Sequence, residues 1–526
     1  VPRQERASPP QSVLSFLVPL HLIMDLSAAS APPQGKPAAL GSRQDRTAMM
    51  VLVIILALAA GLRAWKLGQL SFWYDEAVTM RLATAPTLAA LFDRLFQIDA
   101  TRAPLHPLLL QRWIALFGSS EAAGRSLSVI CGIVIVGLVY WIGLLVFDSA
   151  TGLWAAWLAA ISPQLVYYSR EARMYALLVL ITCLCWGLLF SLRKSSSQGK
   201  SIAYALCLAA LVYCHPLGLL MAATLGLGSL LFVRRFLVRW QRWVGVHLAA
   251  LLLVAPWIRH YFDHDPEFLS GRLPVKFLIG TPIGFIGGNS VVLLGLLIVI
   301  GFGFLHRRGV FAGYSDWSGP ACLVFWLVVP PTLLYAYSWL GNPVFGPSRY
   351  TLYTAPAYLI LVAQGLARLP ALTRYSVAVA LALLIVQELS ATVYAPGLKA
   401  DWRAFSTELA AGLARSPGTE VTVFVKSSDP VRNKEIETAR YYLPERCRLV
   451  PLEDAVSAKP RNEPSGEVYV AVGTKERVAR LPVADVFEIR SMSAFAGLTV
   501  YRVVGPHRGP RSGSRRSAAS GRSGPG

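Results

Sequence analysis

Long apolar runs alternate with short polar segments through the first three quarters of the chain. The pattern predicts a polytopic α-helical membrane protein with about 11 transmembrane helices, although several runs are shorter than the roughly 20 residues that a bilayer requires. The expected spans cover residues 49–67, 125–147, 152–168, 174–191, 201–214, 217–233, 243–259, 290–305, 319–340, 351–367 and 375–394.

Composition supports this class. Hydrophobic residues make up 54% of the 526 residues and charged residues only 15%, with a mean hydropathy of +0.49, which excludes an ordinary soluble globule. The net charge of +21 is better explained by attraction to anionic lipid headgroups than by nucleic acid. Six of the seven cysteines fall within apolar runs, so they are interpreted as small buried hydrophobic residues and predict no disulfide framework.

The basic residues predict the topology. Successive cationic clusters are separated by two apolar runs each time, and the positive-inside rule assigns every cluster to the cytoplasm. The N-terminus is then inside and the C-terminus outside. The clusters are Arg193/Lys194/Lys200, Arg234/Arg235/Arg239/Arg242, Arg307/Arg308 and Arg368/Arg374. Residues 104–118 are expected to lie at the membrane interface rather than to span it, because Arg112 and Trp113 sit in mid-run.

The remaining segments define the predicted domains. Residues 1–48 are expected to be disordered or to precede the true start, and residues 506–526 to be a disordered basic tail. The transmembrane domain covers residues 49–394, with a first external loop at 68–124. Residues 395–505 are expected to form a small exoplasmic α/β domain acting as a lid, an acceptor platform or a stabilising cap. Its predicted helices are Trp402–Arg415 and Val431–Leu443, and its predicted strands are Val421–Lys426, Glu467–Gly473 and Val486–Ile489 with Leu498–Val504.

Two adjacent carboxylates, Asp75 and Glu76, follow the first span in the segment Ser71–Ala77. An arbitrary pair of acids is usually solvated in a loop. Here, however, the topology places the other charged clusters on the same, exoplasmic face. These clusters are Arg102, Glu121/Arg125, Ser169–Tyr175, His215 and Arg349-Tyr350. One face is therefore expected to carry the chemistry.

Several of these residues have a plainer interpretation. Glu121 and Arg125 are one helical turn apart, which favours a structural ion pair between them. His215 is interpreted as a packing residue at the interface. For Arg173 and Tyr175 a phosphate or sugar contact and a loop-fixing salt bridge remain equally open.

The order of the motifs resembles that of GT-C membrane glycosyltransferases, in particular the protein mannosyltransferase and aminoarabinose transferase branch with its family-39-like and Rgt-type members. The similarity covers roughly residues 49–405. It rests on Trp73-Tyr74-Asp75-Glu76-Ala77, Arg102-Ala103-Pro104-Leu105, Phe117-Gly118-Ser119-Ser120-Glu121 with Arg125, Ser162-Pro163, Tyr168-Ser169-Arg170-Glu171-Ala172-Arg173-Met174-Tyr175, Pro347-Ser348-Arg349-Tyr350 and Asp401-Trp402-Arg403.

The resemblance implies an inner-membrane glycosyltransferase that takes a sugar from a polyprenyl-phosphate donor and gives it to a hydroxyl of a protein, glycolipid or surface polysaccharide. It assigns catalysis to Asp75 as general base, with Glu76 and Glu171. A carboxylate within reach of a hydroxyl can take its proton as the new bond forms, which agrees. Arg102 stands where the family usually has Lys or His before Pro-Pro-Leu. The substrate-binding set implied is Tyr74, Arg102, Arg173, Tyr175, Arg349 and Tyr350.

Two alternatives stay open at the sequence level. Asp75, Glu76 and Glu171 have the oxygen ligands that a divalent metal ion prefers, but carboxylates paired with Arg170 and Arg173 would give the same composition without an ion. A transporter or lipid flippase is also polytopic. Such proteins tend to show paired repeats, and this sequence shows no such duplication.

Overall fold

The computed structural model describes residues 43–99, 101–195, 197–232, 240–262, 273–286, 288, 295, 299–301, 318–341, 345, 349–395, 399–415, 419–426, 434–452, 467–473 and 487–506. The predicted N-terminal extension up to residue 42 and the predicted tail beyond residue 506 lie outside this range. So does most of the predicted span at 290–305.

Six helices in the described part of the chain are long and apolar enough to cross a membrane. They are α2 (Arg43–Ala64), α6 (Glu121–Val146), α9 (Tyr175–Lys194), α13 (Trp240–Phe262), α17 (Ser318–Leu340) and α19 (Ala371–Thr392). Each matches a predicted span. The chain is a multi-pass membrane protein, but the structure does not establish the predicted number of 11 spans.

Shorter helices fill the spaces between the long ones. The predicted span at 152–168 is broken, because Pro163 begins a new helix after Ser162, whose hydroxyl donates to the Phe285 carbonyl at 2.7 Å. The predicted span at 351–367 begins as a 3₁₀ turn. These elements are α7 (Ser149–Ile161), α8 (Pro163–Ser169), α10 (Gln198–Cys214), α11 (Leu217–Phe232), α14 (Lys276–Ile279), α15 (Thr281–Phe285), η3 (Leu352–Thr354) and α18 (Ala355–Arg368).

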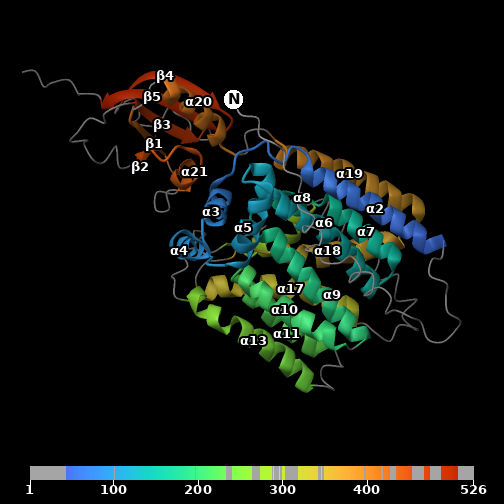
Figure 1. Ribbon diagram of the computed structural model, residues 1–526. Helices are drawn as coiled ribbons and strands as arrows, with labels where there is room; N and C mark the ends of the chain where they lie inside the picture. Colours follow the sequence, from blue (N-terminus) through green and yellow to red (C-terminus); the bar gives the residue numbers. More distant parts are fainter. Residues whose placement is uncertain are drawn as a thin grey trace, which may run out of the picture.

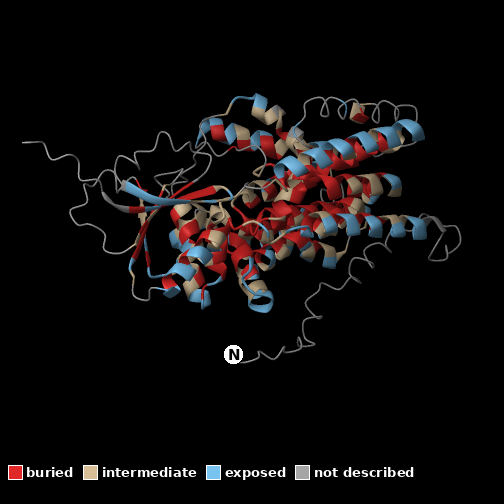
Figure 2. Cartoon of the chain, turned by 90° about the horizontal axis from the view of Figure 1, so that it is seen from above, coloured by how far each residue is buried: buried red, intermediate tan, exposed pale blue. Residues whose placement is uncertain are grey.

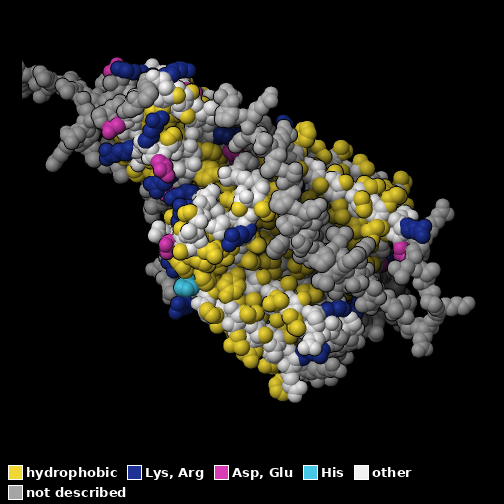
Figure 3. Space-filling model, in the orientation of Figure 1, with side chains coloured by type: hydrophobic (Ala, Val, Ile, Leu, Met, Phe, Trp, Pro, Cys, Tyr) yellow, Lys and Arg dark blue, Asp and Glu magenta, His cyan; other side chains and the backbone are white. Residues whose placement is uncertain are grey.

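The helical part has the surface of a membrane domain. Buried residues line the contacts between helices, whereas the outward faces of the outer helices are exposed (Figure 2). Those exposed faces carry large apolar side chains such as Leu252 on α13 and Leu383 on α19. Hydrophobic side chains accordingly cover a broad face of the helical part (Figure 3). Lipid is the solvent that such a surface suits.

Three helices occupy the first loop between α2 and α6. They are α3 (Tyr74–Ala83), α4 (Leu88–Ile98) and α5 (Leu105–Phe117). Helix α5 covers the ambiguous stretch at 104–118. It has 13 residues, fewer than the roughly 20 that a span requires, and it packs against α3 and α6. Among the described residues, α5 is therefore not one of the six helices that are long and apolar enough to cross a membrane.

The C-terminal segment forms the predicted small α/β domain, beside α3 at one end of the helical part (Figure 1). Helix α21 packs against α3, and α20 and α21 share a core with the sheet. The five strands have the order β2-β1-β3-β5-β4, with β1 parallel to β2 and β3, and β5 antiparallel to β3 and β4. The elements are α20 (Trp402–Arg415), α21 (Lys434–Tyr442), β1 (Val421–Val425), β2 (Cys447–Pro451), β3 (Glu467–Gly473), β4 (Phe487–Phe495) and β5 (Leu498–Pro506).

Candidate functional site

The two predicted acids lie in the first turn of α3, at the end of the helical part that faces the C-terminal domain. Consecutive residues of a helix point about 100° apart. The side chain of Glu76 is therefore fully buried, whereas that of Asp75 is 17% exposed. Neighbouring carboxylates thus meet different surroundings.

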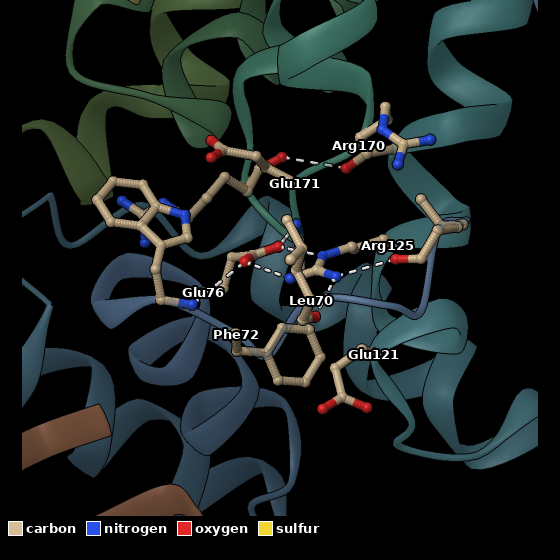
Figure 4. A network of polar contacts seen from close by, with 12 residues as sticks. Leu70, Phe72, Glu76, Glu121, Arg125, Arg170 and Glu171 are labelled. Atoms are coloured by element: carbon tan, nitrogen blue, oxygen red, sulfur yellow. Dashed lines mark hydrogen bonds and ion pairs between the residues drawn. The ribbon is translucent and has the colours of Figure 1, made fainter. Parts of the chain in front are cut away.

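Glu76 is the centre of a buried polar network (Figure 4). Arg125 Nε donates to its Oε1 at 2.7 Å and Nη2 to its Oε2 at 2.8 Å, while the Ala172 N–H donates to Oε1 at 2.9 Å. Lys399 Nζ donates to Oε2 at 2.8 Å. Burial opposes ionisation, but Arg125 and Lys399 outweigh it and lower the pKa of Glu76 to about 2. Glu76 is a permanent carboxylate with its lone pairs occupied.

The expected ion pair between Glu121 and Arg125 is wrong. Arg125 turns inward to Glu76 instead and also donates to the Leu70 carbonyl at 2.7 Å. Glu121 binds the C-terminal domain: Arg403 Nη1 lies 3.0 Å from its Oε2, and the Tyr442 hydroxyl donates to its Oε1 at 3.0 Å. For Arg125, the buried bidentate contact with Glu76 outweighs a neighbour one turn away on the same helix.

Asp75 faces cations from two other segments. Arg349 Nη1 lies 3.1 Å from Asp75 Oδ2, and the Arg349 side chain is 37% exposed. Arg173 Nη1 donates to the Asp75 carbonyl at 3.1 Å and to the Thr79 hydroxyl at 2.8 Å. The structure therefore brings together Asp75, Arg173 and Arg349, which lie far apart in the sequence. An accessible carboxylate beside two guanidinium groups is the result.

Aromatic rings and a histidine pack beside these cations. The His215 ring lies between Tyr175 and Tyr350, with centroid distances of 6.1 and 6.2 Å. Its Nδ1 accepts from the Leu217 N–H at 3.0 Å, which leaves the proton of the neutral ring on Nε2. Burial, with help from the positive charge of Arg173, lowers the pKa of His215 to about 3. The imidazole is therefore buried, neutral and packed between two rings, as a packing residue would be.

Glu171 approaches the network from the turn between α8 and α9. Its side chain is almost completely buried, and Lys399 Nζ lies 3.6 Å from its Oε1. Burial raises the pKa of Glu171 to about 7; Lys399 opposes the shift, and the charges of Glu76 and Asp75 add to it. Glu171 lines a cavity of about 30 Å³, together with Lys66, Leu67, Leu70, Arg125, Tyr167, Arg170, Val393 and Lys399.

The residues present do not fit the divalent metal site that stays open at the sequence level. Glu76 is held by Arg125 and Lys399, and Asp75 faces Arg349. Within the described ranges, no group of three or more His, Cys, Asp or Glu side chains is placed to hold a metal ion. Arg170 does not take the expected place beside the carboxylates. Its guanidinium donates instead to the backbone carbonyls of Arg63, in α2, and of Trp65, just after α2.

Two of the predicted substrate-binding residues lie less centrally. Arg102, at φ 47°, stacks over Phe96 and donates to the His260 carbonyl at 3.4 Å. Among the described residues, no hydrogen bond or ion pair is found between Arg102 and Asp75, Glu76 or Glu171. Tyr74 begins α3 and is half-buried.

The sequence pattern does not predict Lys399 as a residue of the site. It lies in the short connector between α19 and α20, where its charge resembles that of any solvated lysine. The available signal was its position, two residues before Asp401-Trp402-Arg403.

Comparisons with known proteins fit this architecture. Residues 101–260 match the family model described as dolichyl-phosphate-mannose-protein mannosyltransferase. No curated protein matches the sequence. Among solved structures, ArnT from Cupriavidus metallidurans in the apo state is 13% identical, with 87% of this chain and 98% of that chain covered and a TM-score of 0.59.

Two further structures show the same fold. ArnT from the same organism bound to undecaprenyl phosphate is 13% identical, with 86% and 97% of the two chains covered and a TM-score of 0.54. The archaeal oligosaccharyltransferase AglB from Archaeoglobus fulgidus, in complex with an inhibitory peptide and a dolichol-phosphate, is 13% identical, with 88% and 74% covered and a TM-score of 0.50. The predicted GT-C fold and the resemblance to mannosyl- and aminoarabinose transferases are confirmed.

Proposed function

We propose that this protein is a membrane glycosyltransferase that moves a sugar from a polyprenyl-phosphate donor to a hydroxyl acceptor. The observation that carries the proposal is the juxtaposition of Asp75 with Arg349 and Arg173 at one end of a GT-C membrane domain. Among the predicted carboxylates, Asp75 combines accessibility with nearby cations that can bind a phosphate.

The proposed reaction has one proton acceptor. The oxygen of the acceptor hydroxyl forms a bond to the anomeric carbon as the bond between that carbon and the phosphate oxygen breaks. The polyprenyl phosphate leaves with the electron pair, and the hydroxyl proton passes to the Asp75 carboxylate. Burial of Glu76 and its occupied oxygens exclude it from this step and leave it to fix the first turn of α3.

The two arginines, Arg349 and Arg173, are proposed to stabilise the leaving phosphate. Charge develops on the leaving phosphate, and guanidinium groups stabilise such charge with short, charge-assisted hydrogen bonds. Arg349 is partly exposed and Arg173 is buried behind Asp75, so Arg349 is the residue proposed to contact the phosphate directly. Tyr175, Tyr350 and the neutral His215 provide an apolar and hydrogen-bonding surface next to it.

The donor class is proposed from the similar proteins and from the position of the site. One similar structure holds undecaprenyl phosphate and another a dolichol-phosphate. A lipid-linked donor also suits a site at the end of membrane helices. The acceptor is proposed to be a protein, glycolipid or surface polysaccharide, and the sugar a hexose or pentose.

The site is proposed to lie on the exoplasmic side of the inner membrane. It lies where α9 begins at Tyr175, whereas Arg193 and Lys194 lie in the last turn of the same helix. Arg368 likewise ends α18, whose first turn follows Tyr350. The positive-inside rule assigns these basic ends to the cytoplasm and therefore the site to the opposite side.

The donor assignment can be tested with purified protein in lipid vesicles. We expect transfer of labelled sugar from a polyprenyl-phosphate donor and none from a soluble nucleotide sugar, since the proposed phosphate site lies at the end of the membrane helices. Equal transfer from the nucleotide sugar alone would contradict the donor class. Vesicles without protein provide the background.

A further inference from the structure

Lys399 occupies the middle of the carboxylate cluster, although it comes from the C-terminal connector. Its side chain is only 10% exposed, and its ammonium lies 2.8 Å from Glu76 Oε2 and 3.6 Å from Glu171 Oε1. The ring of Trp73 lies on another side, with its centroid 5.9 Å from Nζ. One cation thus bridges an acid of the first loop and an acid of the second.

The connector is held in place immediately after Lys399, at Asp401. The Ser71 hydroxyl donates to Asp401 Oδ1 at 2.8 Å, which ties the connector to the first loop. The Asp401 N–H donates to the Ala496 carbonyl at 2.8 Å, which ties it to the turn between β4 and β5. At Gly497, with φ +70°, a Cβ would lie 2.9 Å from the Lys399 carbonyl.

We propose that Lys399 is a positioning residue: its ammonium takes the central place in the carboxylate cluster and holds the first and second loops together around the reacting groups. The C-terminal domain then contributes to the site through this side chain, beyond covering it. This inference rests on the proposed function for its kinetic part, but the ion bridge stands on geometry alone.

The electrostatics make an ammonium necessary at this point. Glu76 and Glu171 are both buried, and two ionised carboxylates side by side repel each other strongly. Arg125 binds both oxygens of Glu76, and its other N–H groups donate to the carbonyls of Leu67, Leu70 and Ser71, so its donors are occupied without reaching Glu171. Lys399 supplies the charge that links the second acid to the first.

The kinetic test compares Lys399→Met, which keeps the length and removes the charge, with Lys399→Arg. Lys66→Met is the matched control, because Lys66 lies on the rim of the same cavity, is exposed, and stacks over Trp65. At equal folded protein, kcat should fall about tenfold or more in Lys399→Met, with the donor KM changed by less than about threefold, and Lys399→Arg should recover part of kcat. Lys66→Met should behave like the wild type.

A second readout needs no activity. In a thermal-unfolding cycle with Glu171→Gln at about pH 8, where the wild-type Glu171 is ionised, the loss of stability caused by Lys399→Met should be smaller once Glu171 no longer carries a charge. Coupling in this cycle without any transfer by the wild type would refute the proposed function and leave the ion bridge standing.

Three results would overturn the positioning role in an active enzyme. These are additive effects in the unfolding cycle, an unchanged kcat in Lys399→Met, or loss of wild-type activity on chelation with recovery on adding Mn²⁺. In the last case a metal ion would occupy the place assigned to the ammonium.

Discussion

Asp75 and Glu76 are neighbours in the sequence, but their surroundings give the two carboxylates different roles. Both are acids in the first turn of one helix, yet Glu76 is locked between Arg125 and Lys399 while Asp75 stays accessible beside Arg349. Removing one partner of a buried charge pair costs about 3–5 kcal/mol because the other charge is left uncompensated. Loss of Glu76 would therefore damage the fold, whereas loss of Asp75 is expected to affect chemistry.

The buried carboxyl group of Glu171 predicts how the stability of the protein depends on pH. Its pKa is raised from 4.5 to about 7, so the buried acid favours the folded state below pH 4.5, and this contribution is lost as the pH rises through 7. Glu171→Gln cannot ionise and avoids that loss. Its melting temperature relative to the wild type should therefore be higher at about pH 8 than at about pH 5. Thermal unfolding in detergent at both pH values measures this, and a constant difference would contradict the buried, raised carboxyl group.

The sequence located the acids and the arginines but not their partners. Glu121 and Arg125 were paired because they are close along a helix, and the structure shows that tertiary contacts decide instead. Lys399 carried no local signal, since burial of a lone lysine depends on the docking of a domain. Motif order therefore indicated that Asp75, Arg173 and Arg349 come together, but three-dimensional packing was needed to show which residues touch and that Arg102 lies apart.

At the scale of elements, apolar periodicity predicted the long helices and missed the irregular ones. The break after Ser162 lies inside one apolar run, and the 3₁₀ turn at Leu352–Thr354 lies at the start of another. In the C-terminal domain, β2 was missed because Cys447–Pro451 is short and mostly half-buried. The residues of β4 alternate weakly, so only its first residues were predicted.

Helices α6 and α7 provide a prediction about packing. A Cβ at Gly143 would lie 2.8 Å from the Gly152 Cα, which shows how closely the two backbones approach. Gly143→Ala should therefore destabilise the protein by about 1–3 kcal/mol, the usual cost of overpacking. Gly137→Ala on the same helix is the control: a Cβ there has no neighbour within 4 Å, and alanine suits a helix better than glycine.

Thermal unfolding of both variants under the same conditions checks this contrast. Equal melting temperatures for Gly143→Ala and Gly137→Ala would show that α6 and α7 do not pack as described.

At the scale of the molecule, the C-terminal domain is fastened to the first loop at several points. Glu121 binds Arg403 and Tyr442, Arg81 pairs with Glu437, and Lys399 reaches the carboxylates. Such contacts from both ends of the chain make the loop helices and the C-terminal domain one unit. The site is therefore a product of the whole chain rather than of the membrane helices alone.

The orientation of this unit can be measured by cysteine labelling in intact cells. Ser491→Cys, on exposed β4, should react with a membrane-impermeant maleimide from outside, whereas Gln198→Cys, at the start of α10, should react only after permeabilisation. The unmodified protein measures background from its seven cysteines, most of which are buried. The reverse pattern would place the site in the cytoplasm and contradict the proposed topology.

The most direct test of the account is the steady-state rate of sugar transfer by Asp75→Asn from a polyprenyl-phosphate donor. The amide nearly preserves the shape of the carboxylate and cannot take a proton, so turnover should fall about a hundredfold or more while the melting temperature stays close to that of the wild type. Asp93→Asn, an exposed acid on α4 of the same loop, should retain full activity. Near-normal turnover by folded Asp75→Asn would contradict the assignment of Asp75 as the base.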